Sequence, residues 1–529
     1  MSKKRLNFWL AVSIALAAFL PLFLTLESPG FTWDEAIYSG FAFEYVEWLK
    51  SLFVSPHEAL SPQALHRTWS LGHIHPPLGK VLSGISLQLF FHSLGYLAAL
   101  RMSSTILFTV LLVIMFFWAK SEFGLMAGIA SSVSLILMPR FFGHAHLGTL
   151  DLPLTFFYFL AVILFARALK RWDELKFRGR ILAALLSGVG LGLALLTKIN
   201  AAFLPLALWP WAFIYYRKKA LWPVISSALI APLIFIAGWP WLWSQTFSRT
   251  YSYFADKTSR APVAVYFLGS VFKDPPAPWH YPFVLTSLTI PAGLLCAMVL
   301  GLVLCAKGMK RDAARALIIS NALVLLVVAS LPFVPKYDGV RLFLPLFPFL
   351  ALFCGLAIGW IWEKMKRKRV ALRSLIAAGL IIFFATQAFS VIHIAPFWLS
   401  YYNLFAGGLD GAYEMGLEAT YWGDSIDQEV FDFLKDLKPG KLAYAPLGRE
   451  LAHNSKAIGL IHEDFEIVDF KEPHRYLVLV NRQGMLDQRM RKIFQEESPI
   501  FVRECEGVPL TLVYERKPEG SVADDPALP

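Results

Sequence analysis

Long apolar runs, bounded by charged residues or by proline and glycine, fill the chain from its amino terminus to about residue 395. A helix of about 20 apolar residues is long enough to cross a bilayer, so the pattern predicts about eleven transmembrane helices. They are expected at Phe8–Leu26, Met102–Ala119, Gly124–Met138, Leu152–Ala166, Ile181–Leu196, Ile199–Tyr216, Leu221–Gly238, Phe283–Ala306, Ala316–Leu331, Leu342–Trp362 and Leu375–Ile394.

The stretch Gly79–Leu100 is ambiguous, and the basic loops decide how it is interpreted. These loops are "SKKR" near Ser2, "RALKRWDELKFRGR" from Arg167, "YRKK" at Tyr216, "KGMKRDAAR" from Lys307 and "EKMKRKR" from Glu363. If Gly79–Leu100 does not cross, all five loops lie on one face, as the positive-inside rule requires of the cytoplasmic side. We therefore expect Gly79–Leu100 to form helices along the outer surface, with a cytoplasmic amino terminus and an extracytoplasmic carboxyl terminus.

The polar pattern divides the chain into two domains. Residues 1–395 are predicted to form a polytopic α-helical membrane domain with a large first extracytoplasmic loop, about 27–100. Residues 396–529 have mixed polarity, with strand-like runs at Arg475–Val480 and Leu510–Glu515 and a helical pattern around Gln428–Leu437. We expect a small extracytoplasmic α/β domain there, with a disordered tail "PEGSVADDPALP".

Composition agrees with this interpretation. The chain has 529 residues, of which 57% are hydrophobic and only 16% charged, whereas soluble proteins have about 25% charged residues. The net charge of +11 is concentrated in short loops between spans, so we attribute it to membrane topology and expect no nucleic-acid partner. The four cysteines indicate no disulfide framework.

An acidic pair, Asp34 and Glu35, follows the first apolar run at the predicted outer surface. Acidic residues suit the first turn of a helix because they oppose its dipole, so the pair could cap an interfacial helix. The alternative is that Asp34 is a general base at the membrane surface, where low dielectric raises the basicity of a carboxylate. Spacing alone leaves both interpretations open.

Two histidine motifs fall on the same predicted face. "GHIHPPLGK" contains His73, His75 and Lys80, and it could be a helix start stiffened by proline or a site for a phosphate. "GHAH" adds His144 and His146, with Asp151 nearby, so a metal cage is a further alternative. An H-x-H pair alone supplies only two ligands, whereas structural zinc takes four.

Three cations lie where apolar spans begin or end: Arg101, Lys198 and Arg341. Charged groups at membrane depth are usually paired or functional, although long cationic side chains also extend to the interface. Together with Asp34, they suggest a site for an anionic lipid headgroup.

Several segments resemble glycosyltransferase family 39, the protein O-mannosyltransferases and related polyprenyl-phosphate-sugar transferases with the GT-C fold. They are "TWDEAIYSG", "HPPLGK", "PRFFGHAHLGTLDLPLTFF", "GLGLALLTKIN", "RLFLPLFPFLAL" and "YYNLFAGGLDGAYEMGLEATYWGD". The resemblance runs from about Trp33 to Asp424. The chain has no room for the beta-trefoil domain of eukaryotic-type protein mannosyltransferases. Lipid A-modifying members share the fold and also carry a carboxyl-terminal extracytoplasmic domain.

The resemblance implies an inverting transfer of a hexosyl or pentosyl group from a dolichyl- or undecaprenyl-phosphate donor to a hydroxyl of a protein or glycolipid in the cell envelope. Asp34 maps onto the family's catalytic base, Glu35 onto its neighbour, and Arg101 onto an arginine that holds the acidic loop. The "HPPLGK" element maps close to the lipid-phosphate site.

The expected roles of the other candidate residues follow from charge and position. We expect Arg341, Lys198, His75 and Lys80 to bind the donor phosphate, with support from His73, His144, His146 and Asp151. No cofactor is required by the sequence, and a divalent metal is not excluded by it.

Two other classes of protein fit the composition. A transporter or lipid flippase would also be polytopic with ionisable residues, but it would place them at the midplane and show repeated halves, which this chain lacks. A structural membrane scaffold would leave the acidic pair and the cations without a role.

Overall fold

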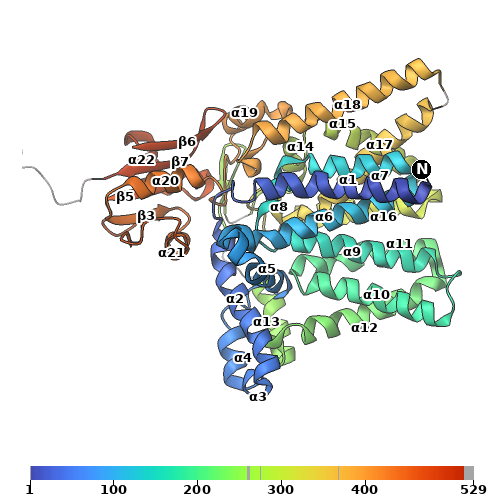
Figure 1. The fold of residues 1–529 in the computed structure, drawn as a ribbon, viewed down its shortest axis with the longest axis horizontal. Helices are drawn as coiled ribbons and strands as arrows, with labels where there is room; N and C mark the ends of the chain where they lie inside the picture. Colours follow the sequence, from blue (N-terminus) through green and yellow to red (C-terminus); the bar gives the residue numbers. More distant parts are fainter. Residues whose placement is uncertain (1, 259–262, 274–275, 367, 517–529) are drawn as a thin grey trace, which may run out of the picture.

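Membrane-length helices form a bundle in the computed structural model, which describes residues 2–258, 263–273, 276–366 and 368–516 (Figure 1). The principal bundle helices are α1 (Lys3–Leu24), α6 (Tyr96–Phe123), α7 (Leu125–Ile136), α8 (Pro139–His146), α9 (Asp151–Lys170), α10 (Phe177–Leu195), α11 (Leu204–Tyr216), α12 (Leu221–Ala237), α15 (Ala292–Gly308), α16 (Ala313–Ser330), α17 (Phe347–Met365) and α18 (Val370–His393). The predicted disordered tail lies outside the described residues.

Every predicted apolar run overlaps one of these helices, but the count of eleven crossings is not confirmed. Nine helical segments in the described ranges are long and apolar enough to cross a membrane, or ten if α7 and α8 count as one bent span. The chain bends by 70° between α7 and α8, at Pro139. Residues Ile199–Ala237 count as one of the nine segments, although the basic turn η2 (Arg217–Ala220) separates α11 from α12 within it.

The turns that carry basic residues gather at one end of the bundle, here called the basic end. Lys170, at the end of α9, pairs with Glu122 of α6 at 2.7 Å, and Lys219, between α11 and α12, pairs with Asp173. The amino terminus lies at this end as well (Figure 1). The opposite end is here called the site end.

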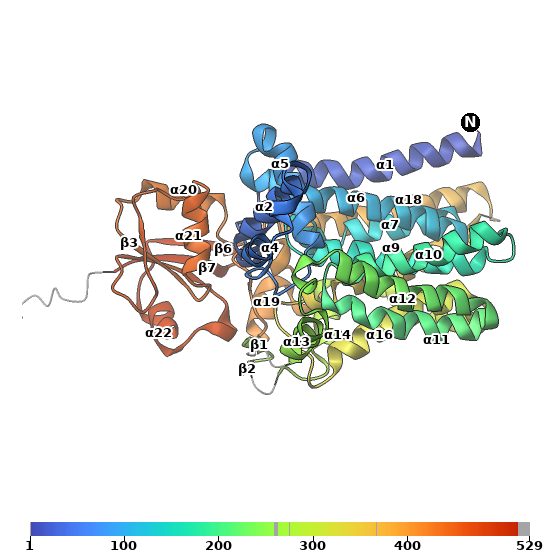
Figure 2. The ribbon, with the colours of Figure 1, turned by 90° about the horizontal axis from the view of Figure 1, so that it is seen from below.

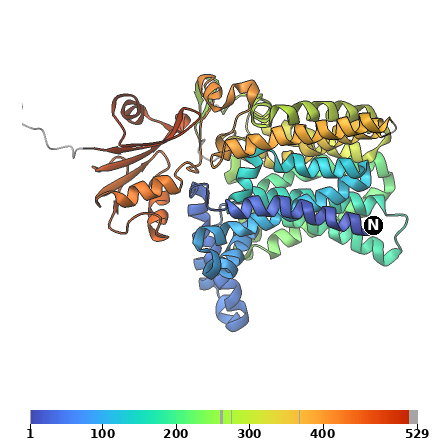
Figure 3. The same ribbon diagram turned by 45° about the horizontal axis from the view of Figure 1, so that its top comes forward.

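The first loop folds into helices that lie across the site end (Figures 1 and 3). They are α2 (Trp33–Val54), α3 (Pro56–Ala59), α4 (Pro62–Trp69) and α5 (Leu78–Leu94). The segment α5 is not among the candidate membrane spans of the described residues, as the basic-loop argument predicted. Tyr45 of α2 stacks on Trp69 at 4.1 Å between ring centres, which fixes α2 against α4.

Further short elements complete the site end: α13 (Thr246–Thr258), β1 (Val265–Phe267), β2 (Ser270–Phe272), α14 (Tyr281–Thr289) and the 3₁₀ turn η5 (Arg341–Leu346). The strands β1 and β2 pair as an antiparallel hairpin. After α18 the chain returns over this end through the 3₁₀ turn η6 (Trp398–Ser400) and α19 (Gly408–Glu414). The side chain of Asn403 anchors it by donating to the carbonyls of Ser287 and Ile290.

The carboxyl-terminal domain is a five-stranded mixed sheet in the order β4-β3-β5-β7-β6 (Figure 2). Its elements are α20 (Gln428–Asp436), β3 (Lys441–Ala445), α21 (Arg449–Ala457), β4 (Glu466–Ile467), β5 (Tyr476–Val480), α22 (Gln488–Glu496), β6 (Phe501–Cys505) and β7 (Val508–Glu515). β3 pairs in parallel with β4 and β5, whereas β7 pairs antiparallel with β5 and β6. The predicted strands at 475–480 and 510–515 are confirmed, and so is the helix near 428–437.

Candidate active site

The start of α2 directs the two adjacent carboxylates to different places. Glu35 turns back onto the first turn, where its Oε2 accepts hydrogen bonds from the Thr32 amide at 3.1 Å and hydroxyl at 2.9 Å. This is the reciprocal half of a helix-capping arrangement, so the capping interpretation holds for Glu35. Asp34, one residue earlier, lies about 100° away around the helix and points elsewhere.

Arg101 of α6 neutralises Glu35 in the protein interior. Its Nε and Nη2 donate to the two Glu35 oxygens, each at 2.8 Å, and both side chains are fully buried. The same guanidinium also donates to the carbonyls of Leu26, Pro29 and Gly30. These contacts bury both groups and tie Glu35 and Arg101 to the loop that precedes α2.

Asp34 forms an ion pair with Arg341 at the start of η5. Arg341 Nη2 lies 3.2 Å from Asp34 Oδ2, and Nη1 lies 2.9 Å from Oδ2 of Asp338. The guanidinium also lies over the Trp422 ring, 4.4 Å from its centre. The Asp34 side chain keeps 17% of its surface exposed, so it is the member of the acidic pair that a substrate can reach.

The groups around Asp34 raise the pKa of its carboxyl group. Burial raises the pKa of the Asp34 carboxyl, while the Arg341 guanidinium opposes the increase; Asp151 and Asp338 add to it and Lys198 opposes it. A carboxylate with a raised pKa is a stronger base than one in water, and its arginine partner keeps it oriented. The geometry therefore suits proton abstraction.

Lys198 and Asp151 form a second buried ion pair beside the first. Lys198 Nζ donates to Asp151 Oδ1 at 2.5 Å, whereas Asp151 Oδ2 has no hydrogen-bond partner in the described structure. His144 of α8 is also buried, with its Nε2 3.5 Å from the Tyr421 hydroxyl. The charges of Asp151 and Lys198 both act on Asp34.

The "GHIHPPLGK" element has a different arrangement. The Lys80 ammonium donates to the carbonyls of Gly72 at 2.6 Å and His75 at 2.9 Å, and only 2% of the residue is exposed. His73 stacks on Trp241, with 4.7 Å between ring centres. In this structure, then, Lys80 stabilises the turn that carries the two histidines, and its expected contact with a donor phosphate stays a prediction.

The two H-x-H pairs do not converge on a common point. His146 hydrogen-bonds to the Thr25 hydroxyl at 2.8 Å and stacks on Trp398, away from His73 and His75. No group of three or more His, Cys, Asp or Glu side chains in the described residues is arranged to hold a metal ion. The metal-cage alternative therefore has no support in this part of the chain.

Sequence reasoning missed several residues that shape the site, among them Asp338, Trp422 and Arg482. Asp338 stands three residues before Arg341 in "KYDGVR", and that spacing was the available signal for it. The others lie far along the chain and reach the site only through the fold.

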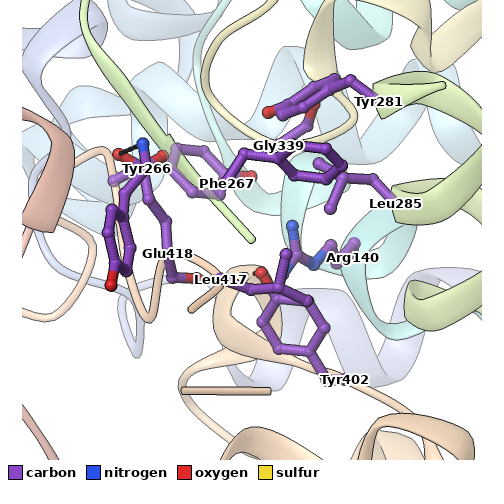
Figure 4. A pocket seen from close by; sticks show the side chains of 10 residues that line it. Arg140, Tyr266, Phe267, Tyr281, Leu285, Gly339, Tyr402, Leu417 and Glu418 are labelled. Carbon is purple, nitrogen blue, oxygen red and sulfur yellow. Dashed lines mark hydrogen bonds between the residues drawn. The ribbon is translucent and has the colours of Figure 1, made fainter. Parts of the chain in front are cut away.

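Arg140 of α8 lines a small buried cavity with Tyr266, Tyr281, Tyr402 and other residues (Figure 4). Its guanidinium lies 4.4 Å from the centre of the Tyr402 ring. The cavity volume of about 10 Å³ is enough for one water molecule and far too small for a sugar. This cavity is therefore not the donor site.

Two crystal structures of ArnT from Cupriavidus metallidurans share this fold over nearly the whole chain. The one bound to undecaprenyl phosphate has a TM-score of 0.52 at 14% identity and covers 96% of this chain and 97% of its own. The apo state has a TM-score of 0.53 at 13% identity, covering 97% and 98%. The archaeal oligosaccharyltransferase AglB from Archaeoglobus fulgidus, with an inhibitory peptide and a dolichol-phosphate, has a TM-score of 0.47 at 11% identity, covering 89% and 69%.

The chain therefore has the fold of these two ArnT structures. The family model described as dolichyl-phosphate-mannose-protein mannosyltransferase matches residues 11–250, which include Asp34, Glu35, Arg101 and Lys198. This match agrees with the family resemblance found in the sequence over those residues. No curated protein sequence matches the chain.

Proposed function

We propose that the protein transfers a sugar from a polyprenyl phosphate to a hydroxyl group of a protein or glycolipid at the site end, with Asp34 as the base. The observation that carries this proposal is the Asp34–Arg341 pair. The Asp34 carboxylate is partly exposed and its pKa is raised. It lies 3.2 Å from the Arg341 guanidinium at the end of the membrane bundle. Transfer of a sugar from a phosphate needs both a proton acceptor and a cation that neutralises the phosphate. Asp34 and Arg341 are such a pair of groups, side by side.

The proposed step is a single displacement. Asp34 takes the proton of the acceptor hydroxyl as its oxygen attacks the anomeric carbon, and the bond from that carbon to the phosphate oxygen breaks. The bonding pair leaves with the phosphate, so the products are the glycoside with inverted configuration, polyprenyl phosphate and a protonated Asp34. The proton then passes to water.

The leaving phosphate gains negative charge, so it needs neutralisation more than it needs a proton. Arg341 is the first candidate because it sits beside the base and its planar guanidinium suits a phosphate. Lys198 is the second, since its charge also acts on Asp34. The ArnT structure bound to undecaprenyl phosphate supports a carrier of that class.

The proposed orientation places the basic end in the cytoplasm and the site end, with the carboxyl-terminal domain, outside the plasma membrane. The gathering of the basic turns at one end supports it, because cytoplasmic loops carry the excess of lysine and arginine. At the outer surface the donor's lipid tail stays in the bilayer while its sugar reaches Asp34.

The test uses purified full-length protein in liposomes with a panel of undecaprenyl-phosphate-linked sugars, and it follows the release of undecaprenyl phosphate. The wild type is expected to release the carrier from at least one donor when membrane extract supplies acceptors. Asp34→Asn should lower the rate by about 10²–10⁴-fold, the usual contribution of a positioned base. Absence of release from every donor would overturn the proposal.

A further inference from the structure

The carboxyl-terminal domain reaches the active-site loop through Arg482. This residue follows the central strand β5 and is only 1% exposed. Its Nη2 donates to Asp338 Oδ1 at 2.6 Å, and its Nη1 donates to the Tyr421 carbonyl at 2.9 Å. Asp338 is therefore shared between two arginines, because its other oxygen lies 2.9 Å from Arg341 Nη1.

Of the two groups that Arg482 holds, Asp338 contacts Arg341 directly and Tyr421 reaches it through the next residue. Asp338 pairs with its guanidinium, and Tyr421 immediately precedes Trp422, whose ring lies against it. The Trp422 carbonyl in turn accepts a hydrogen bond from the Trp33 amide at 3.1 Å, next to Asp34. Arg482 thus fixes two of the surfaces that set the direction of Arg341.

The backbone at Asp338 shows that this loop is held by its surroundings. Asp338 has φ of 55° and the following Gly339 has φ of 62°. A left-handed conformation is sparsely populated for residues other than glycine and persists where neighbouring contacts impose it. The bond from Arg482 to the Asp338 carboxylate is such a contact.

We propose that Arg482 is a positioning residue for binding of the donor phosphate, acting through Asp338 on Arg341; this rests on the proposed function. Along this chain of contacts two carboxylates, Asp34 and Asp338, face two guanidinium groups, Arg341 and Arg482, and the charge of Arg482 also acts on Glu418. Loss of Arg482 leaves one negative charge uncompensated, and it leaves Arg341 as the only arginine that pairs with the Asp338 carboxylate among the described residues. Both effects weaken the attraction of Arg341 for an anion.

The experiment is a double-mutant cycle on the full-length protein in nanodiscs, with undecaprenyl phosphate as the probe. Arg482→Gln should bind the probe about tenfold more weakly, the size expected for one coupled charged group, and the KM for the donor should rise more than kcat falls. Asp338→Asn in the Arg482→Gln background removes the uncompensated carboxylate, so the double variant should bind more tightly than Arg482→Gln alone.

Arg503→Gln is the matched control in the same domain. Arg503 pairs with Asp427 at 2.7 Å and Glu429 at 2.9 Å, and among the described residues neither carboxylate pairs with Arg341 or Arg482. It is expected to bind the probe as the wild type does. Equal losses in Arg482→Gln and Arg503→Gln, or additive losses in the cycle, would overturn the role of Arg482. A wild type that binds the probe but releases no carrier from any donor would instead contradict the proposed function.

Discussion

Two neighbouring carboxylates in one helical turn have separate tasks because the fold surrounds them differently. Glu35 meets Arg101 and accepts three further hydrogen bonds, from the Thr32 amide, the Thr32 hydroxyl and the Gly148 amide, in full burial, whereas Asp34 meets Arg341 at the edge of the site. Removing one partner of a buried, hydrogen-bonded pair typically costs about 3–5 kcal/mol. A variant at Glu35 therefore reports on folding, while a variant at Asp34 reports on chemistry.

The pH dependence of transfer should follow Asp34. A base must be deprotonated, so kcat/KM is expected to fall as the pH drops through the pKa of Asp34. Because burial raises that pKa, the acid limb should lie above the usual value of 3.8 for an aspartate. Profiles of kcat/KM against pH on a saturating acceptor would measure it.

Asp338→Asn provides the control for this assignment. The charge of Asp338 raises the pKa of Asp34, so removing it should move the acid limb to lower pH. An acid limb that stays in place in Asp338→Asn would argue that another group titrates.

At the residue scale, the sequence was informative where a charge interrupts an apolar run. Asp34, Lys198 and Arg341 stand out in this way, and the structure brings them close enough to influence one charge. Glu35 and Arg101 also stand out, yet only the fold shows that they neutralise each other. Arg482 gives no such signal, because it lies in a polar domain where an arginine is ordinary.

At the scale of elements, α2 carries the acidic pair and its position depends on close packing against α5. A Cβ atom added at Gly84 of α5 would lie 2.2 Å from the carbonyl oxygen of Ala42 in α2. Glycine at this position lets the two helices approach backbone to backbone. The position of Asp34 therefore depends partly on Gly84, which lies 50 residues later in the chain.

Gly84→Ala should displace α2 and lower both stability and activity. Overpacking of this kind costs about 1–3 kcal/mol, because the clash is with backbone and not with a flexible side chain. Thermal unfolding in detergent and kcat/KM would show the two losses together.

Gly40→Ala is the matched control within α2 itself. A Cβ atom there would meet nothing within 4 Å, and alanine is favoured over glycine in a helix by about 0.5–1 kcal/mol. It should keep activity and unfold at the same or a higher temperature. If Gly84→Ala behaved like Gly40→Ala, close packing of α2 and α5 would not position the site.

Most elements could be predicted because hydrophobic period and length depend on local sequence alone. The strands β5 and β7 were identified in that way, whereas the surface position of α5 was predicted from the distribution of the basic loops. The number of crossings could not, since α7 has only 12 residues and the chain bends by 70° between it and α8. The pairing of distant elements, such as β5 with the loop at Asp338, is a tertiary property that no local pattern contains.

At the scale of the whole molecule, charge is distributed asymmetrically along the bundle axis. Basic turns lie at one end, while the acidic pair, Arg341 and the carboxyl-terminal domain lie at the other (Figures 1 and 2). Such an arrangement suits an enzyme that works at one membrane surface better than a carrier with charges at the midplane.

The proposed orientation predicts which cysteines a membrane-impermeant maleimide can label in intact cells. In a chain whose native cysteines are replaced, Lys435→Cys in the carboxyl-terminal domain should be labelled directly, because Lys435 is exposed. Lys219→Cys, exposed at the basic end, should be labelled only after permeabilisation. The reverse pattern would invert the proposed orientation and place the active site in the cytoplasm.

The most direct test of the account separates binding from chemistry at the Asp34–Arg341 pair. Affinity for undecaprenyl phosphate and single-turnover release of the carrier would be measured for the wild type, Asp34→Asn and Arg341→Gln in the same nanodiscs. The account predicts that Asp34→Asn binds the carrier at least as tightly as the wild type but does not transfer, while Arg341→Gln loses affinity. Transfer at the wild-type rate by Asp34→Asn would contradict it.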